Sequence, residues 1–227
     1  MYFVIKGMMK TAHFAKGDKS IEFIINCANE EFAQNGSKTT LNGICEKYKI
    51  SKGRMYHFFT SKEDLLCNCF KYSLEKVANA INDFEIDKNA SLEDNLHNYY
   101  NEIINHWLKN PNDIITIERI AKMSQVNFSE KNYLRLKGYK NELADCVTGK
   151  FLQIIKSKKV KMRVNETVIK QIISAMYQQM FLNFSNDLIS ALKSGNYRLA
   201  KEKKKSLLRN YDILIDAFLN GIAEKEY

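Results

Sequence analysis

The stretch from Lys47 to Lys62 concentrates hydroxyl, cationic and aromatic side chains and contains no acidic residue. Its polar and aromatic members are Ser51, Lys52, Arg54, Tyr56 and His57. An arginine side chain can bind both acceptors of a guanine edge, whereas lysine, tyrosine and serine more often hold phosphates. A solvent-facing helix would more often carry glutamate among its lysines. The composition therefore favours a polyanionic partner.

Two short helices are expected to position these side chains. Apolar residues recur at helical spacing before the stretch, at Leu41, Ile44, Cys45 and Tyr48. They predict a helix over Thr40–Tyr48, with the Thr39 hydroxyl available to cap it, and Ser51 supplies a start signal for a second helix. Gly53 would let another backbone approach the second helix closely. Two helices joined by a tight turn form a helix-turn-helix, whose second helix lies in the major groove of DNA.

The longer pattern resembles the N-terminal domain of the tetracycline-repressor (TetR) family. A TT pair at Thr39-Thr40 is followed by S-x-G-x-x-Y-x-x-F-x-S-K-E-x-L from Ser51 to Leu65, and the resemblance covers roughly Ser20 to Leu66. In that family the second threonine, the start of the recognition helix, the tyrosine and the lysine of S-K-E usually touch DNA. The full expected DNA-binding set is Thr39, Thr40, Ser51, Lys52, Gly53, Arg54, Tyr56, His57 and Lys62.

The turn departs from the family pattern. The family commonly has Gly-Val where this chain has Lys49-Ile50. Lysine tolerates a positive φ less easily than glycine, so we expect strain or a different turn shape at Lys49. Arg54 and His57 occupy positions that vary across the family, so the resemblance does not specify an operator sequence.

Charge and cysteine usage fit an intracellular DNA-binding protein. The 227 residues carry a net charge of +9, and residues 1–62 hold ten Lys and Arg against five Asp and Glu. The number of cysteines, five, is odd, which favours a reduced, cytoplasmic protein without disulfide bonds. Cys67 and Cys69 lie two residues apart and would point to different sides of a helix, so we expect structural thiols. The first residues are too short an apolar run for a membrane helix and lack the regions of a signal peptide. No membrane association is expected.

The remaining sequence predicts an all-α fold of about nine helices, without strands or repeats. We expect a flexible arm over residues 1–19, a three-helix helix-turn-helix domain over 20–66, and a larger helical domain for ligand binding and dimerisation over 67–227. The first helix carries an apolar stripe from Ile21 to Phe32 and ends at Asn35-Gly36. Later helices are expected at about 61–84, 91–110, 112–124, 129–156, 165–193 and 199–222, with a break at Pro111.

The last two predicted helices carry apolar stripes too broad for one core. A four-helix interface between two copies would cover them, and the family resemblance implies the same homodimer. The expected interface residues are Ile172, Met176, Met180, Tyr211, Ile215 and Phe218. The alternative is that both faces are buried within one subunit.

The middle section is rich in aromatic residues, and TetR-like proteins often enclose a ligand there. A mostly apolar site with a few polar groups would suit an apolar or aromatic small molecule. The expected lining is Tyr100, Trp107, Glu118, Arg119, Met123 and Tyr177, although aromatic residues at helical spacing also form ordinary core.

The sequence contains no common catalytic, phosphate-binding or metal-binding motif, so we expect no enzyme, cofactor or metal. The resulting hypothesis is a ligand-responsive repressor that binds a palindromic operator on double-stranded DNA as a homodimer. The alternative is a DNA-bound interaction protein that recruits a partner and uses no small-molecule ligand.

Overall fold

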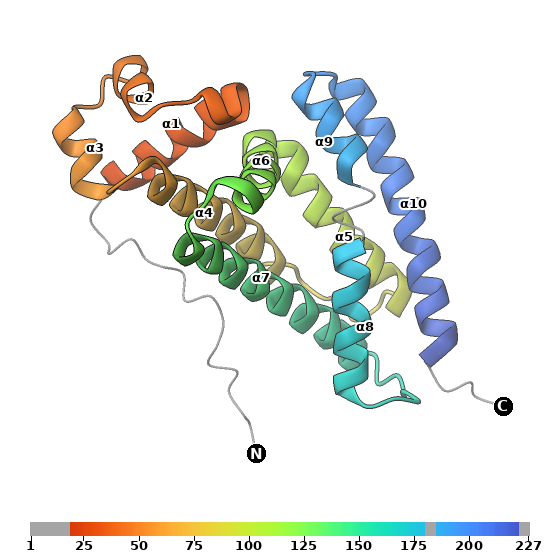
Figure 1. Ribbon diagram of the computed structural model, residues 1–227. Helices are drawn as coiled ribbons and strands as arrows, with labels where there is room; N and C mark the ends of the chain where they lie inside the picture. The colour runs from red at the N-terminus through yellow and green to blue at the C-terminus, as the bar shows by residue number, and fades with distance from the viewer. Residues whose placement is uncertain (1–18, 180–184, 223–227) are drawn as a thin grey trace. The chain divides into compact units, whose positions relative to one another are not determined.

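The computed structural model describes residues 19–179 and 185–222, and these residues are helical throughout their regular structure (Figure 1). The all-α prediction is confirmed. The helices are α1 (Lys19–Asn35), η1 (Gly36–Lys38), α2 (Leu41–Lys47), α3 (Lys52–Phe58), α4 (Lys62–Asn82), α5 (Leu92–Lys109), α6 (Pro111–Asn127), α7 (Glu130–Ser157), α8 (Glu166–Gln179), α9 (Ser185–Lys193) and α10 (Tyr197–Ile222). The arm predicted over residues 1–19 lies outside the described residues except for Lys19.

Besides shifts of one to three residues at helix ends, the division into helices differs from the sequence-based prediction at two places. The helix expected over 165–193 is described as two helices, α8 and α9, so the described residues form ten α-helices rather than about nine. Pro111 is the first residue of α6. Proline lacks the N–H that the first turn leaves unpaired, and its fixed φ suits a helix start. The residue expected to break one helix therefore begins the next.

Contacts between Cα atoms divide the chain into two compact units. Unit 1 comprises Met1–Lys76 and Asn110–Leu143, and unit 2 comprises Val77–Lys109 and Ala144–Tyr227. The first unit is therefore built from two separate stretches of chain, which bring α6 and the first half of α7 together with α1 to α3. None of the helices in the described ranges is long and apolar enough to cross a membrane.

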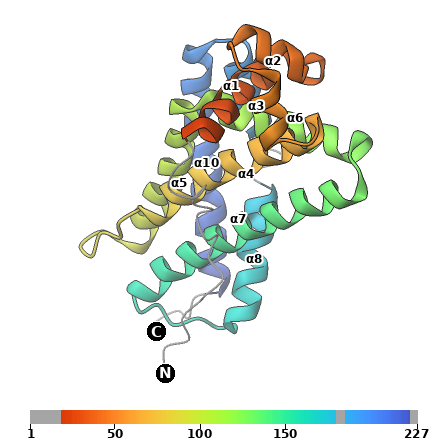
Figure 2. The same ribbon diagram turned by 90° about the vertical axis from the view of Figure 1, so that its left-hand side faces the viewer.

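In unit 1, α1 packs along α6, as both views of the ribbon show (Figures 1 and 2). The apolar stripe of α1 faces inward: Ile24, Ile25 and Ala28 are fully buried. Ile117 and Ile120 of α6 are buried as well. This packing fixes α1, against which α2 is placed.

In unit 2, the long helix α10 packs against both α5 and α9. Buried residues on α5 include Leu96, Ile103 and Trp107, and those on α10 include Leu207 and Ile215. The helices enclose a largely aromatic interior, described below.

Candidate nucleic-acid interface and interior cavity

Side-chain hydroxyls cap both short helices of the helix-turn-helix. Thr40 Oγ1 accepts a hydrogen bond of 3.0 Å from the Gly43 N–H at the start of α2. Ser51 Oγ accepts one of 3.2 Å from the Arg54 N–H at the start of α3. Each cap satisfies an N–H that the helix itself leaves unpaired. Ser51 therefore begins the second helix as the sequence predicts.

Thr39 does not cap α2, contrary to the sequence-based interpretation. Its side chain is buried, and its hydroxyl donates a hydrogen bond of 3.1 Å to the Glu31 carbonyl of α1. The backbone places Thr40 at the N-cap instead, because α2 begins one residue later than expected. Thr39 joins α2 to α1 and leaves Thr40 exposed.

The turn between α2 and α3 consists of Tyr48, Lys49 and Ile50. Lys49 has a φ of 56°, which a lysine tolerates less easily than glycine, so of the two expectations for this turn the structure has the strained one. The Ile50 N–H donates to the Cys45 carbonyl over 2.9 Å, which closes the turn. Ile44 and Met55 are fully buried and hold the two helices together.

The outer side of α3 is exposed and free of acidic groups. The exposed residues of the expected DNA-binding set here are Ser51, Lys52, Gly53, Arg54, Tyr56 and His57. Half of the Tyr56 surface is accessible, at 51%. The Arg54 guanidinium donates to the hydroxyl of Ser20 in the first turn of α1. The sequence reasoning missed Ser20, although its place at the start of a helix could have indicated a polar contact.

Lys62, the first residue of α4, is half-buried. Its ammonium donates a hydrogen bond of 2.7 Å to the carbonyl of Ser37 in η1. Burial lowers the pKa of this ammonium below its ordinary value. Two of its protons are left for another acceptor, such as a phosphate.

Residues 24–68 match the family model described as bacterial regulatory proteins, tetR family. The match covers both capped helices, their turn and the start of α4. Residues 24–68 are therefore a TetR-family DNA-binding domain. The chain is accordingly a DNA-binding transcriptional regulator.

Solved structures of related fold span most of the regulator. A transcriptional regulator from Rhodococcus sp. Rha1 has a TM-score of 0.65 at 11% identity, covering 91% of this chain and 100% of its own. A TetR-family regulator from Mesorhizobium loti has a TM-score of 0.59 at 16% identity, covering 90% and 96%. FadR from Bacillus subtilis, in complex with stearoyl-CoA, has a TM-score of 0.54 at 17% identity, covering 82% and 97%. No curated protein sequence matches. At these identities the likeness concerns the fold.

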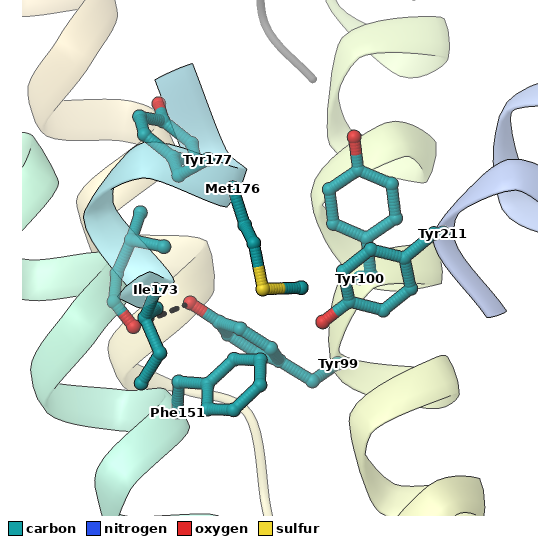
Figure 3. A pocket seen from close by; sticks show the side chains of 8 residues that line it. Tyr99, Tyr100, Phe151, Ile173, Met176, Tyr177 and Tyr211 are labelled. Atoms are coloured by element: carbon teal, nitrogen blue, oxygen red, sulfur yellow. Dashed lines mark hydrogen bonds between the residues drawn. The ribbon is translucent and has the colours of Figure 1, made fainter. Parts of the chain in front are cut away.

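The second candidate site is a cavity inside unit 2 of the regulator (Figure 3). Four tyrosines and four aliphatic or aromatic residues line it: Tyr99, Tyr100, Val147, Phe151, Ile173, Met176, Tyr177 and Tyr211. They come from α5, α7, α8 and α10. The rings of Tyr100 and Tyr211 are stacked, with centroids 4.0 Å apart and planes inclined by 16°. Figure 3 shows the Met176 side chain reaching toward these two rings from α8.

The cavity is apolar and tightly filled. Its void is about 20 Å³, space for roughly one water-sized molecule and too little for a drug-sized ligand without side-chain movement. The Tyr99 hydroxyl donates to the Val147 carbonyl over 3.2 Å. Burial raises the pKa of Tyr99, Tyr100, Tyr177 and Tyr211. All four phenols are therefore neutral at physiological pH.

Only some of the residues expected to bind a ligand line the cavity. Tyr100 and Tyr177 line the cavity, whereas the buried Trp107 does not. Glu118, Arg119 and Met123 lie on α6, in the other unit. The other six lining residues were absent from that set, although Tyr99 belongs to the same aromatic stripe of α5.

The residues expected at the dimer interface lie partly on the surface and partly inside the subunit. Ile172 is half-exposed on α8, and Met176 lines the cavity. Tyr211, Ile215 and Phe218 are packed inside the subunit, which leaves them without surface to offer a partner. For these three the alternative of burial within one subunit holds. Met180 lies outside the described residues.

Among the residues that the structure describes, no group of three or more His, Cys, Asp or Glu side chains is arranged to hold a metal ion.

Proposed function

We propose that the regulator is a cytoplasmic repressor that binds a palindromic operator as a homodimer and responds to a small, uncharged aromatic effector. The observation that carries the DNA-binding part is the exposed, acid-free outer side of α3, presented by two capped helices.

In this proposal α3 enters the major groove. Arg54 is the side chain best suited to read a base edge, because its planar fork can bind two guanine acceptors. Lys52 and Lys62 hold phosphates and set the register. Thr40 contacts the backbone from the start of α2. Thr39 acts indirectly by fixing α2 to α1.

A homodimer would give the recognition site two-fold symmetry. The support from this chain is the apolar surface left on the two helices expected at the interface. Val168 and Ile172 are half-exposed on α8, and Ile213 on α10 is 61% exposed. A two-fold dimer would present its α3 helices to half-sites about 34–36 Å apart.

The lining of the cavity indicates the chemistry of the effector. None of its eight lining residues is charged, and its surface is entirely apolar. Stearoyl-CoA, which FadR from Bacillus subtilis binds, carries phosphates that would need cationic partners, so this cavity suits a different ligand. A neutral aromatic ring could stack on Tyr100 once Tyr211 or Met176 swings away.

A second candidate function is a DNA-bound protein that recruits a partner without an effector. The observation that favours it is the small void, because the stacked Tyr100 and Tyr211 rings already fill the space. In that case the cavity is simply the core of unit 2.

Selection of bound DNA from a random pool, with the full chain, tests operator recognition. We expect a palindrome whose half-sites are separated by about one helical turn, near 10 base pairs. Arg54→Ala should lower discrimination between the selected operator and single-base variants at one position of each half-site, by about 1–3 kcal/mol. Recovery of no common sequence would refute operator recognition, and a non-repeated sequence would refute the dimer.

Thermal unfolding with a panel of neutral aromatic molecules separates the two candidates. A ligand at 100 times its Kd stabilises the folded state by about 2.7 kcal/mol. Tyr100→Leu should abolish the stabilisation by removing the ring on which the effector stacks. The control is Tyr197→Leu, at an exposed tyrosine of the same unit. A panel without any shift would favour the recruiting protein.

A further inference from the structure

A buried carboxylate on α6 holds together three helices of unit 1. Asp113 is 4% exposed. It accepts a hydrogen bond of 3.3 Å from Asn29 on α1, one of 3.3 Å from Ser73 on α4, and one of 3.1 Å from the Lys76 ammonium. A buried carboxylate is costly unless it is paired and hydrogen-bonded. These contacts supply both requirements, so the three helices are joined at one side chain.

Asn29 of α1 is hydrogen-bonded to two residues of α6. Its side chain is buried, and its amide also donates to the Ser73 hydroxyl over 3.0 Å. One turn after Asp113, the Thr116 hydroxyl donates to the Asn29 main-chain carbonyl over 3.1 Å. Two residues of α6 therefore hold the side chain and the backbone of one residue of α1. Hydrogen bonds are directional, so this pair restricts rotation of α1 more than apolar packing alone would.

The same cluster reaches the recognition helix through the N-terminal half of α1. The Lys76 ammonium lies 4.5 Å from the centroid of the Tyr72 ring, and the Tyr72 hydroxyl donates to Glu22 over 2.7 Å. Two residues before Glu22, Ser20 accepts the hydrogen bond from Arg54. Contacts therefore run from Lys76 to the start of α1, and from there to the side chain expected to read bases.

The ion pair also lies where the chain passes between the two compact units. Lys76 is the last residue of unit 1 on α4, and Asn110, three residues before Asp113, is the first residue of its second stretch. The Lys76–Asp113 bond therefore ties one end of the first stretch to the start of the second.

We propose that Asp113, Lys76 and Asn29 are positioning residues for operator reading: they hold α1, and with it Arg54, in the orientation that discriminates the operator. This inference rests on the proposed function. It assigns a role in DNA recognition to a residue of α6, outside the segment that matches the family model.

The test compares binding of each full-length variant to the selected operator and to a random-sequence duplex, at a temperature where each variant remains folded. Asp113→Ala should lower the ratio of operator to random affinity at least tenfold. Asp113→Asn should lose less, because its side-chain oxygen can still accept from Asn29 and Ser73. Lys76→Met should lower the ratio as well, and keeps the test available if Asp113→Ala fails to fold.

Asp113→Ala also removes a negative charge, which raises affinity for any DNA. Glu142→Ala, an exposed acid of α7 in the same unit, is the matched control and should leave the ratio unchanged. Adding Asn29→Ala to Asp113→Ala should cause no further loss if the two residues act together.

Lower melting temperatures with an unchanged affinity ratio would overturn the inference, since the cluster would then be merely structural. If the wild-type chain selects no operator, the proposed function itself fails. The two failures are distinguishable because the second is seen in the wild type alone.

Discussion

The Lys62 ammonium donates a hydrogen bond of 2.7 Å to the Ser37 carbonyl, which fastens the start of α4 to the connection between α1 and α2. The family resemblance assigns this lysine to DNA, and the structure gives it a partner within the domain. The two roles are compatible, because an ammonium has three protons to donate.

Replacing Lys62 by methionine should therefore affect both binding and stability. We expect weaker binding to all DNA sequences, with the slope of log K against log salt reduced by about 1. The free energy of unfolding should fall by no more than about 1 kcal/mol, since water can replace the lysine at the Ser37 carbonyl. Lys137→Met, at an exposed lysine of α7, is the control for charge alone. Equal salt slopes for the two variants would exclude a phosphate contact by Lys62.

Lys49 carries backbone strain that glycine would relieve. A φ of 56° destabilises the folded state by about 1–2 kcal/mol for a residue with a Cβ. Glycine avoids this strain, but it loses more conformational entropy on folding, which offsets part of the gain. We expect Lys49→Gly to raise the free energy of unfolding by about 0.5–1 kcal/mol in urea titrations. Lys49→Ala removes the same charge and keeps the Cβ, so it should bring no such gain. A gain of equal size in both variants would trace the effect to charge.

Gly36 has a φ of 56°, and an added Cβ would collide with Nη1 of Arg119 from α6. Gly36→Ala should lower the free energy of unfolding by about 1–2 kcal/mol through backbone strain, plus the cost of moving the guanidinium. In an Arg119→Ala background the substitution should cost less, because only the strain remains. Urea unfolding of the four proteins measures the difference. Identical costs in both backgrounds would mean that the guanidinium moves aside freely.

Burial raises the pKa of the Cys67 thiol from its ordinary value of 9.0 to about 11. Between these two pH values the unfolded chain has lost this proton while the folded chain keeps it. Stability supplied by the neutral thiol is complete below pH 9 and is lost as the pH rises toward 11. Unfolding of the wild type should therefore become easier over this range more steeply than that of Cys67→Ala. Parallel stability curves would contradict the raised pKa.

The sequence predicted those features that depend only on a residue and its immediate neighbours in the chain, such as helix caps and turns. Ser51 predicted a helix start because a hydroxyl at an N-cap needs only the next turn of backbone. Lys49 predicted strain or a different turn shape because the family has glycine at that place. The sequence did not predict that Thr40, rather than Thr39, caps α2. This outcome depends on a one-residue shift in the start of α2 and on the Glu31 carbonyl of α1, which binds the Thr39 hydroxyl.

Long-range packing could not be predicted in the same way. Glu118 and Arg119 were assigned to a ligand site because they lie among aromatic residues in the sequence, yet α6 packs on α1. The broad apolar stripe around Tyr211 predicts a dimer interface. The structure stacks Tyr211 on Tyr100, more than a hundred residues earlier. Neither pairing has a local signal, because each depends on which helices meet.

The two-part construction of unit 1 limits how the regulator can exchange modules. A fusion that joined residues up to Lys76 to a foreign sensor domain would leave out α6, and with it Asp113 and the buried isoleucines that cover α1. The stripe of Ile24 and Ile25 would then face water. Exchange of unit 2 between such regulators therefore needs three junctions, after Lys76, Lys109 and Leu143, or a recipient whose own sixth helix fits this α1.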